Sequence, residues 1–230
     1  MKRPAAILLF MVLGLVSALP MAGAADPDPL QLERRWTVIA PPAGQKPGQS
    51  PFESLTDFKF VGPNNDPNVI GEYKADGEWG LSGRVFQQTS GEAAAVKLGR
   101  AEDFSLEAVA NFDGTGGWFL MMGSDGEAGH VLSHSSLRQN DYWRTYPLRG
   151  GRADKFGVKT HSDSFRPRGD QPMWIIVKDG KLSLRIGETV VLREHELDGY
   201  AEGDIVLGSF KNQYGVKLLK FKALRVRALR

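Results

Sequence analysis

Cysteine is absent from all 230 residues of the chain. Its absence excludes disulfides, thiol catalysis and metal sites built on thiolates. The folded domain must therefore be held together by its hydrophobic core, which a chain of roughly 200 residues can supply. Phosphate-binding loops, dinucleotide fingerprints, heptads and internal repeats are also absent, so no motif of these kinds points to a function.

Long apolar runs are scarce, and the only one lies at the N-terminus. Two basic residues precede an apolar stretch over 5–18, and an Ala-Gly-Ala cleavage pattern ends at Ala24. The stretch is too short to span a bilayer comfortably. The pattern predicts a signal peptide over 1–24, cleaved near Ala24, and hence a secreted or periplasmic protein. A retained N-terminal anchor is the alternative.

The mature chain has no excess of either positive or negative residues. The full sequence has 29 Lys and Arg against 27 Asp and Glu, and residues 1–24 hold two basic residues and no acidic one. Cleavage therefore leaves 27 of each sign. A neutral chain gives no indication of nucleic-acid binding, and no membrane span is expected after cleavage. The sequence leaves the oligomeric state open.

Glycine (27 residues) and proline (13) are plentiful, which suits many short strands joined by turns. Residues 25–51 form a polar, Pro-rich N-terminal extension and linker by composition. Residues 52–230 are expected to form one domain. Within it the stretch Ser54 to Asp57 is ambiguous and is compatible with a single helical turn.

The last quarter of the chain determines the predicted fold class. The apolar run 174–178 and the alternating run 181–186 are joined by Asp179-Gly180, a dipeptide typical of type I′ hairpins. Gly187 with the residue after it suits a type II′ turn. In the last apolar stretch, Phe221, Leu224 and Val226 are spaced by three residues and then by two. A regular strand keeps a spacing of two, so a β-bulge is predicted near Ala223. We expect an all-β, two-sheet antiparallel sandwich or jelly roll of about ten to twelve strands.

Seven segments carry a resemblance to a known fold family. They are Trp79 to Gly83, Asp103 to Glu107, Gly116 to Phe119, Trp174 to Gly180, Gly187 to Val190, Gly203 to Gly208 and Phe221 to Arg227. Their order resembles the concanavalin A-like lectin and glucanase (LamG-like) sandwiches. Within these, the chain is most similar to the secreted bacterial domains called 3-keto-disaccharide hydrolase-like.

The resemblance implies a carbohydrate-associated sandwich, and it rests on core and turn residues. The Leu-Phe-Asn-Gly-Lys opening of that group is missing, and so is its Glu-x-Gln segment. No catalytic residue is therefore carried over. If the chain is an enzyme, the resemblance implies a hydrolase or lyase that acts on 3-keto-glycosides. The third hypothesis is a non-catalytic module that binds protein in the cell envelope.

Sandwich lectins bind sugars on a concave sheet face or on rim loops, by stacking aromatic rings on the sugar and bonding its hydroxyls with polar side chains. Residues 130–170 break the regular strand pattern and are rich in both side-chain types. The candidate substrate-binding residues there are His134, Asn140, Asp141, Tyr142, Trp143, Arg144 and His161. The alternative is that the rings belong to the core and the charges to a solvated rim.

Metal and carboxylate sites are weakly indicated. Asp113 and Asp125, with Asn111 and Glu127, flank two loops and are candidate ligands of a rim Ca²⁺, although Asp-Gly pairs are also ordinary turn residues. The segment that contains Asp125 and Glu127 is predicted to be a turn and not a strand that would place both carboxylates on one sheet face. A two-carboxylate glycosidase is therefore not indicated. His130 and His134 are four residues apart, a spacing that suits metal binding on a helix. Strand or loop is predicted here, so the spacing does not indicate a metal site.

Basic residues alternate with apolar ones near the C-terminus. Two interpretations are open: the solvent face of an outer strand, where Lys and Arg discourage edge pairing, or a surface that binds an acidic polysaccharide. The run comprises Lys211, Lys217, Lys220, Lys222, Arg225, Arg227 and Arg230.

Overall fold

The computed structural model describes residues 50–63, 70–113, 116–137, 141–216 and 220–229. The predicted signal peptide, nearly all of the N-terminal extension and the candidate Asn140 lie outside the described residues. In the part of the chain that is described, no helix is long and apolar enough to cross a membrane.

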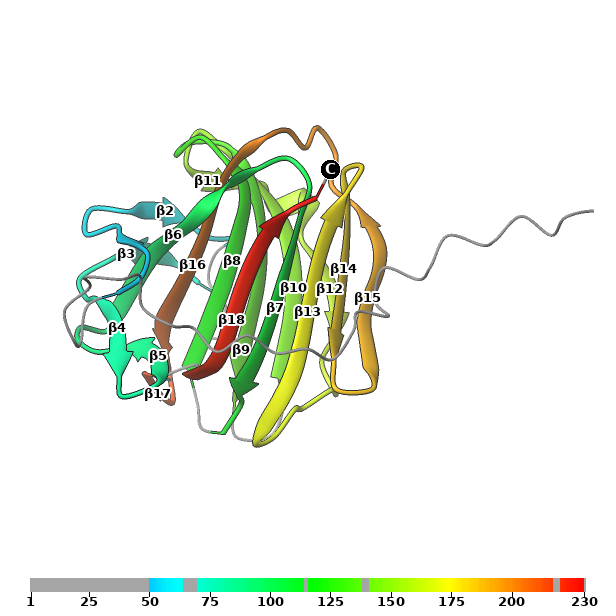
Figure 1. Cartoon of the computed structure of the whole chain (residues 1–230). Coiled ribbons are helices and arrows are strands. Elements are labelled where there is room, and N and C mark those ends of the chain that lie inside the picture. The colour runs from blue at the N-terminus through cyan, green and yellow to red at the C-terminus, as the bar shows by residue number, and fades with distance from the viewer. Residues whose placement is uncertain (1–49, 64–69, 114–115, 138–140, 217–219, 230) are drawn as a thin grey trace, which may run out of the picture.

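The described strands form two sheets that pack face to face (Figure 1). The smaller has seven strands, in the order β15 (Thr189–Glu196), β14 (Lys181–Ile186), β13 (Asp170–Lys178), β7 (Phe104–Asn111), β18 (Lys220–Ala228), β5 (Val85–Gln88) and β4 (Trp79–Ser82). The sandwich prediction is confirmed.

The larger sheet has eleven described strands. Nine follow one path: β1 (Glu53–Ser54), β6 (Ala93–Ala101), β16 (Gly203–Asn212), β8 (Gly116–Ser124), β9 (Gly129–Ser136), β10 (Asp141–Arg149), β11 (Arg152–Ala153), β2 (Lys59–Val61) and β3 (Glu72–Lys74). Beside that path, β12 (Lys159–Ser162) pairs with β10 and β17 (Gly215–Val216) pairs with β16. A single 3₁₀ turn, η1 (Lys155–Gly157), follows β11.

The predicted turns are present. Asp179 and Gly180 both have positive φ, 51° and 68°, as a type I′ turn between β13 and β14 requires. Gly187 has φ 56° in the next two-residue turn. The ladder between β18 and β7 shifts register between Phe221 and Ala223, which confirms the β-bulge.

The main core lies between the two sheets, because each strand turns alternate apolar residues inward. Its members from the smaller sheet include Leu106, Ile175 and Leu184. Those from the larger sheet include Leu120 and Leu207. Each of these five side chains is fully or almost fully buried.

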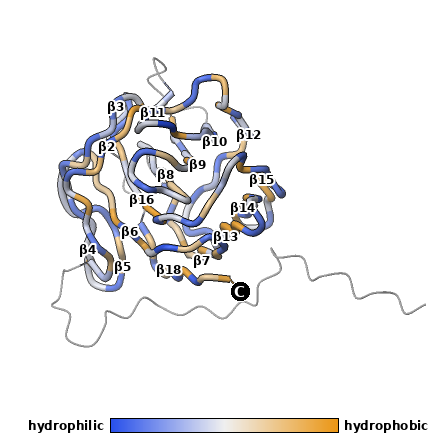
Figure 2. The backbone as a smooth tube through the Cα atoms, turned by 90° about the horizontal axis from the view of Figure 1, so that it is seen from above, coloured by the Kyte–Doolittle hydropathy of each residue, from blue (hydrophilic) through white to orange (hydrophobic). Residues whose placement is uncertain are grey.

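A second core covers the opposite face of the larger sheet. Figure 2 shows β8 and β16 lying between the smaller sheet and the β2–β3 hairpin. The hairpin places Phe60 and Tyr73 on Phe119 and Met121, which point away from the first core. This face of the larger sheet is therefore covered by side chains of the hairpin.

The larger sheet also curls back toward its own start. After β3, the N–H of Asp76 donates to the carbonyl oxygen of Ala93 at 2.8 Å, and Gly77 forms a parallel bridge with Ala94. The strand β3 thus leads directly to β6, and the second core is enclosed.

Two local predictions differ from the structure. Ser54 belongs to a two-residue strand, and the following residues form a turn rather than a helix, because Leu55 joins the sheet through its N–H to Ala95. The segment over 130–172 is more regular than its polar composition indicates. It contains β9 and β10, whose polar side chains bond to one another inside the sheet.

Candidate functional site

The predicted sugar-binding stretch splits across the two faces of β10. Asp141 and Trp143 point between the sheets, and Trp143 is 0% exposed. Tyr142 and Arg144 point the other way and are half-buried, with the guanidinium 4.9 Å from the Tyr142 ring centre. A strand separates neighbouring residues in this way, so the stretch does not form one surface.

The buried half of this stretch is a structural network. Asp141 accepts a hydrogen bond from Ser136 at 3.0 Å and lies 3.1 Å from Nε2 of His134. The guanidinium Nε of Arg166 is 3.4 Å from the same carboxylate. The ring of Trp143 stacks on His134 at 4.1 Å. A fully buried ring offers no face to a sugar, so direct contact through Trp143, His134 and Asp141 does not fit this structure.

His161 lies elsewhere, at the edge where β12 approaches β15. Its Nε2 is 2.7 Å from the hydroxyl of Thr145, and Nε2 of His195 is 2.9 Å from the same oxygen. Burial, and then the neighbouring His195, lower the pKa of His161 to about 4. Burial, followed by Lys159, lowers the pKa of His195. The two imidazoles are therefore neutral at pH 7 and join the two sheets.

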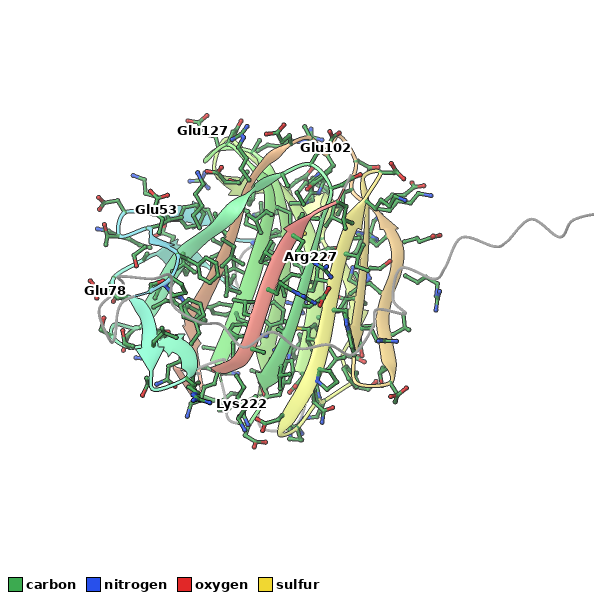
Figure 3. All side chains as sticks on the ribbon, viewed as in Figure 1. Glu53, Glu78, Glu102, Glu127, Lys222 and Arg227 are labelled. Atoms are coloured by element: carbon green, nitrogen blue, oxygen red, sulfur yellow. The ribbon has the colours of Figure 1, made fainter. Side chains whose placement is uncertain are left out.

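The candidate calcium ligands do not meet. Asp113 lies near one end of β8 and Asp125 at the other, and a nine-residue strand is about 30 Å long. Figure 3 shows the corresponding ends of the sandwich, with Glu127 at one and Lys222 at the other. The two carboxylates therefore do not form one calcium site in this structure.

Each of these carboxylates instead accepts backbone hydrogen bonds. Oδ1 of Asp113 accepts the N–H of Gly169 at 2.8 Å. Oδ1 of Asp125 accepts the N–H groups of Glu127 and Ala128 at 2.9 and 2.6 Å, and these bonds lower its pKa. No group of three or more His, Asp or Glu side chains suited to a metal occurs among the described residues.

A cavity with a volume of about 650 Å³ lies beside the second core. This is within the range of ~300–1,000 Å³ that is usual for small-ligand sites. Three segments distant in sequence form its walls: residues 57–61 with 72–74, residues 126–127, and residues 150–152. We call it the hairpin cavity, after the β2–β3 hairpin that forms most of it.

Backbone hydrogen bonds hold the walls of the hairpin cavity together. The N–H of Gly151 donates to the carbonyl of Glu127 at 2.6 Å, and the N–H of Val61 donates to the carbonyl of Gly151 at 2.8 Å. Asp125 fixes the loop that carries Glu127. The three wall segments are therefore joined through their backbones.

Aromatic rings line one side of the hairpin cavity. Phe58 is half-buried, and its ring lies 6.1 Å from that of Phe60. Tyr73 lies 5.1 Å from Phe60 and 4.9 Å from Phe119. Phe58 thus keeps part of a ring accessible while the other three rings support it.

The rim of the hairpin cavity carries balanced charge. Three acidic and three basic side chains are exposed there: Asp57, Glu72, Glu127, Lys59, Lys74 and Arg152. With no excess of either sign, the rim favours an uncharged ligand with many hydroxyls over a polyanion.

Lys217 and Arg230 of the C-terminal basic run lie outside the described residues, and most of its described members contact acidic side chains. Arg225 and Arg227 both contact the buried Glu107 across the outer face of the smaller sheet, where Figure 3 labels Arg227. Lys222 contacts Asp170. This pairing agrees with a solvent-facing surface of the smaller sheet, but β18 lies between β7 and β5, so the expectation that these side chains protect a sheet edge is wrong.

Sequence reasoning did not find the hairpin cavity. The available signal was the alternation of Phe58 and Phe60 around Lys59, which indicates a strand with one apolar face. His195 was also missed, because it comes close to His161 only through the packing of the two sheets.

No protein-family model matches the chain, and no curated protein matches its sequence. Similar solved structures include the β-glucanase of Bacillus licheniformis, with 10% identity over 78% of this chain and 92% of that one and a TM-score of 0.51. The LamA protein of Z. galactanivorans, in complex with laminaritriose and laminaritetraose, has 9% identity over 79% and 95% and a TM-score of 0.50. The chain therefore has the fold of the concanavalin A-like jelly-roll sandwiches.

Proposed function

We propose that the chain is a carbohydrate-binding sandwich whose ligand site is the hairpin cavity. The observation that carries the proposal is the half-buried ring of Phe58 in a cavity of about 650 Å³ with a charged, hydroxyl-bonding rim. An aromatic ring stacks on the C–H surface of a pyranose, while Asp, Glu, Lys and Arg bond its hydroxyl groups.

The balanced rim selects the class of glycan. Asp57 and Glu72 repel an anionic ligand. Lys59 and Arg152 line the same cavity and repel a cationic ligand. A neutral oligosaccharide is therefore the expected ligand. The structural likeness to a β-glucanase and to a protein solved with laminari-oligosaccharides supports a neutral glucan as the first probe.

Binding is favoured over chemistry at this site. The lining residues include no histidine, and the four histidines of the chain lie on β9, β12 and β15 instead. The resemblance to the 3-keto-disaccharide hydrolase-like domains stays a prediction, so a 3-keto-glucoside belongs among the probes. We also propose that the signal peptide over 1–24 directs the protein to the periplasm or outside the cell.

Titration calorimetry of the purified protein tests the proposal. The probes are laminaritetraose, cellotetraose, maltotetraose, methyl 3-keto-glucoside and an alginate tetramer as the charged comparison. We expect saturable binding of a neutral oligosaccharide and weaker binding of alginate. Phe58→Ala should weaken the affinity by about two- to tenfold, since a stacked aromatic contact contributes ~0.5–1.5 kcal/mol.

Two further variants provide a second test of the cavity and a control outside it. Arg152→Ala removes an exposed rim side chain and should weaken binding while leaving the fold intact. Tyr214→Ala removes an exposed ring from the β16–β17 turn, outside the cavity, and should change nothing. If no probe binds, or if both cavity variants bind like the wild type, the proposal is wrong.

A further inference from the structure

One aromatic ring of the described residues is presented entirely to solvent. Phe156 is 101% exposed, whereas Tyr214 at 40% and Val190 at 37% are more than half covered. A single exposed apolar residue is ordinary by itself, so the case for a function rests on the fixed backbone and on the basic side chains beside the ring.

The backbone around Phe156 is firmly held. Asp154 caps η1 through Oδ1, which accepts the N–H of Phe156 at 3.0 Å. The N–H of Asp154 in turn donates to the carbonyl of Pro147 on β10 at 3.0 Å, and the N–H of Gly157 donates to the carbonyl of Asp154 at 3.1 Å. A Cβ on Gly157 would lie 2.6 Å from the Pro147 ring, so the turn is seated closely on β10. Phe156 is therefore displayed by a fixed element.

Basic residues flank Phe156 in the sequence. The stretch 149–159 contains four basic residues and one acidic residue, a net charge of +3 in a chain that is otherwise nearly neutral. The four, Arg149, Arg152, Lys155 and Lys159, are all exposed. The carboxylate of Asp154 is occupied by the cap. Acidic residues of other elements face both ends of this stretch. Glu196 and Asp198 share a small cavity with Lys159, and Asp57, Glu72 and Glu127 line the hairpin cavity with Arg152, so Lys155 and Arg149 carry the attraction to an anion.

We propose that the turn 152–159 docks the protein on an anionic lipid surface, with Phe156 inserted at the headgroup boundary and the basic side chains on the lipid phosphates. A ring inserted into the interface is buried on its apolar edges, and each nearby Lys or Arg gains attraction from anionic lipid. An acidic polysaccharide offers both charge and C–H faces that stack on the ring, so vesicles that carry no glycan separate the two partners. The site is distinct from the hairpin cavity, which only Arg152 of this turn lines.

Co-sedimentation of the full protein with vesicles tests the docking. We expect binding to vesicles of equal parts phosphatidylglycerol and phosphatidylcholine, weaker binding to phosphatidylcholine alone, and a further loss as salt is raised. Phe156→Ser should reduce the partition coefficient about fivefold, and Lys155→Gln by about the same factor. Both residues are exposed, so the melting temperature should not change.

Tyr214→Ser is the matched control, because it removes another exposed ring from a different turn. It should bind vesicles like the wild type. Absence of binding to the anionic vesicles would overturn the proposal. Binding that depends on Lys155 but not on Phe156 would overturn it as well, because the attraction would then be purely electrostatic.

Discussion

His161 of the larger sheet and His195 of the smaller sheet share one hydroxyl group, that of Thr145, with their ring centres 4.6 Å apart. Thr145 has a single hydroxyl hydrogen to donate. At most one imidazole accepts this hydrogen, so at least one ring donates its own Nε2–H to the same oxygen. A ring that accepts must be neutral, and two protonated rings 4.6 Å apart repel each other, which makes the joint between the sheets sensitive to pH.

The first prediction is that acid weakens the fold through this joint. Burial holds the folded-state pKa of His161 at about 4, below the 6.5 that is usual for a histidine side chain, so the unfolded chain binds more protons between these two pH values. Stability should be constant above pH 6.5 and should fall as the pH drops toward 4. The loss is about 1–2 kcal/mol, because the imidazole is partly exposed and solvent screens the charges. Chemical denaturation as a function of pH measures it.

His161→Gln is the matching variant. It should have a flatter stability profile between pH 4 and 6.5 than the wild type. The other groups near His195 are Lys159, Asp198 and Glu196, so residual pH dependence is expected from them. An unchanged profile in His161→Gln would show that this joint does not sense pH.

The second prediction concerns Asp141. Its carboxylate is buried against His134, Ser136 and Arg166, so Asp141→Ala leaves buried polar groups without their partner. The free energy of unfolding should fall by about 3 kcal/mol. Urea titration measures this, with Asp163→Ala on an exposed bend as the control. Full stability in Asp141→Ala would contradict the structural role.

The third prediction separates Trp143 from sugar binding. Trp143→Phe keeps an aromatic ring in the core but removes the indole N–H that donates to the carbonyl of Phe165 at 3.1 Å. Stability should fall by about 1–3 kcal/mol, while sugar affinity should equal that of the wild type. Calorimetry at a temperature where the variant is fully folded compares the affinities. Loss of sugar binding without loss of stability would show that Trp143 contributes to the ligand site and would contradict this prediction.

The fourth prediction is that Asp125 organises the cavity rim without a metal. Asp125→Ala removes the acceptor for the N–H groups of Glu127 and Ala128, so both amides should exchange hydrogen faster. Affinity for the sugar should fall with them, since Glu127 belongs to the rim. Chelators should leave both measurements of the wild type unchanged. A calcium-dependent melting temperature would contradict this assignment.

The architecture was readable from the sequence because local signals decide it. Asp179 with Gly180 fixes a hairpin through backbone sterics alone, and the irregular step before Leu224 marks the bulge. Such signals depend on residues a few positions apart. They do not reveal which face of a strand points inward, so Trp143 and Tyr142 were equally good candidates for the surface.

The hairpin cavity depends on contacts that local patterns do not encode. Phe58, Glu127 and Gly151 meet only because the larger sheet curls and β2 pairs in parallel with β11. The His161–His195 joint likewise depends on how far one sheet edge approaches the other. Residues separated by tens of positions become neighbours through topology, and topology follows from the whole sequence.

The return of the chain from β3 to β6 also bears on how the molecule behaves at high concentration. An exposed strand edge offers unpaired N–H and C=O groups to another molecule. Here Asp76 bonds to the carbonyl of Ala93, and β1 pairs with β6 along Lys97 and Val96, so much of this seam is already satisfied within the chain. Breaking the seam would expose the unpaired edge of β6, and an exposed strand edge is where pairing between molecules, and hence aggregation, starts.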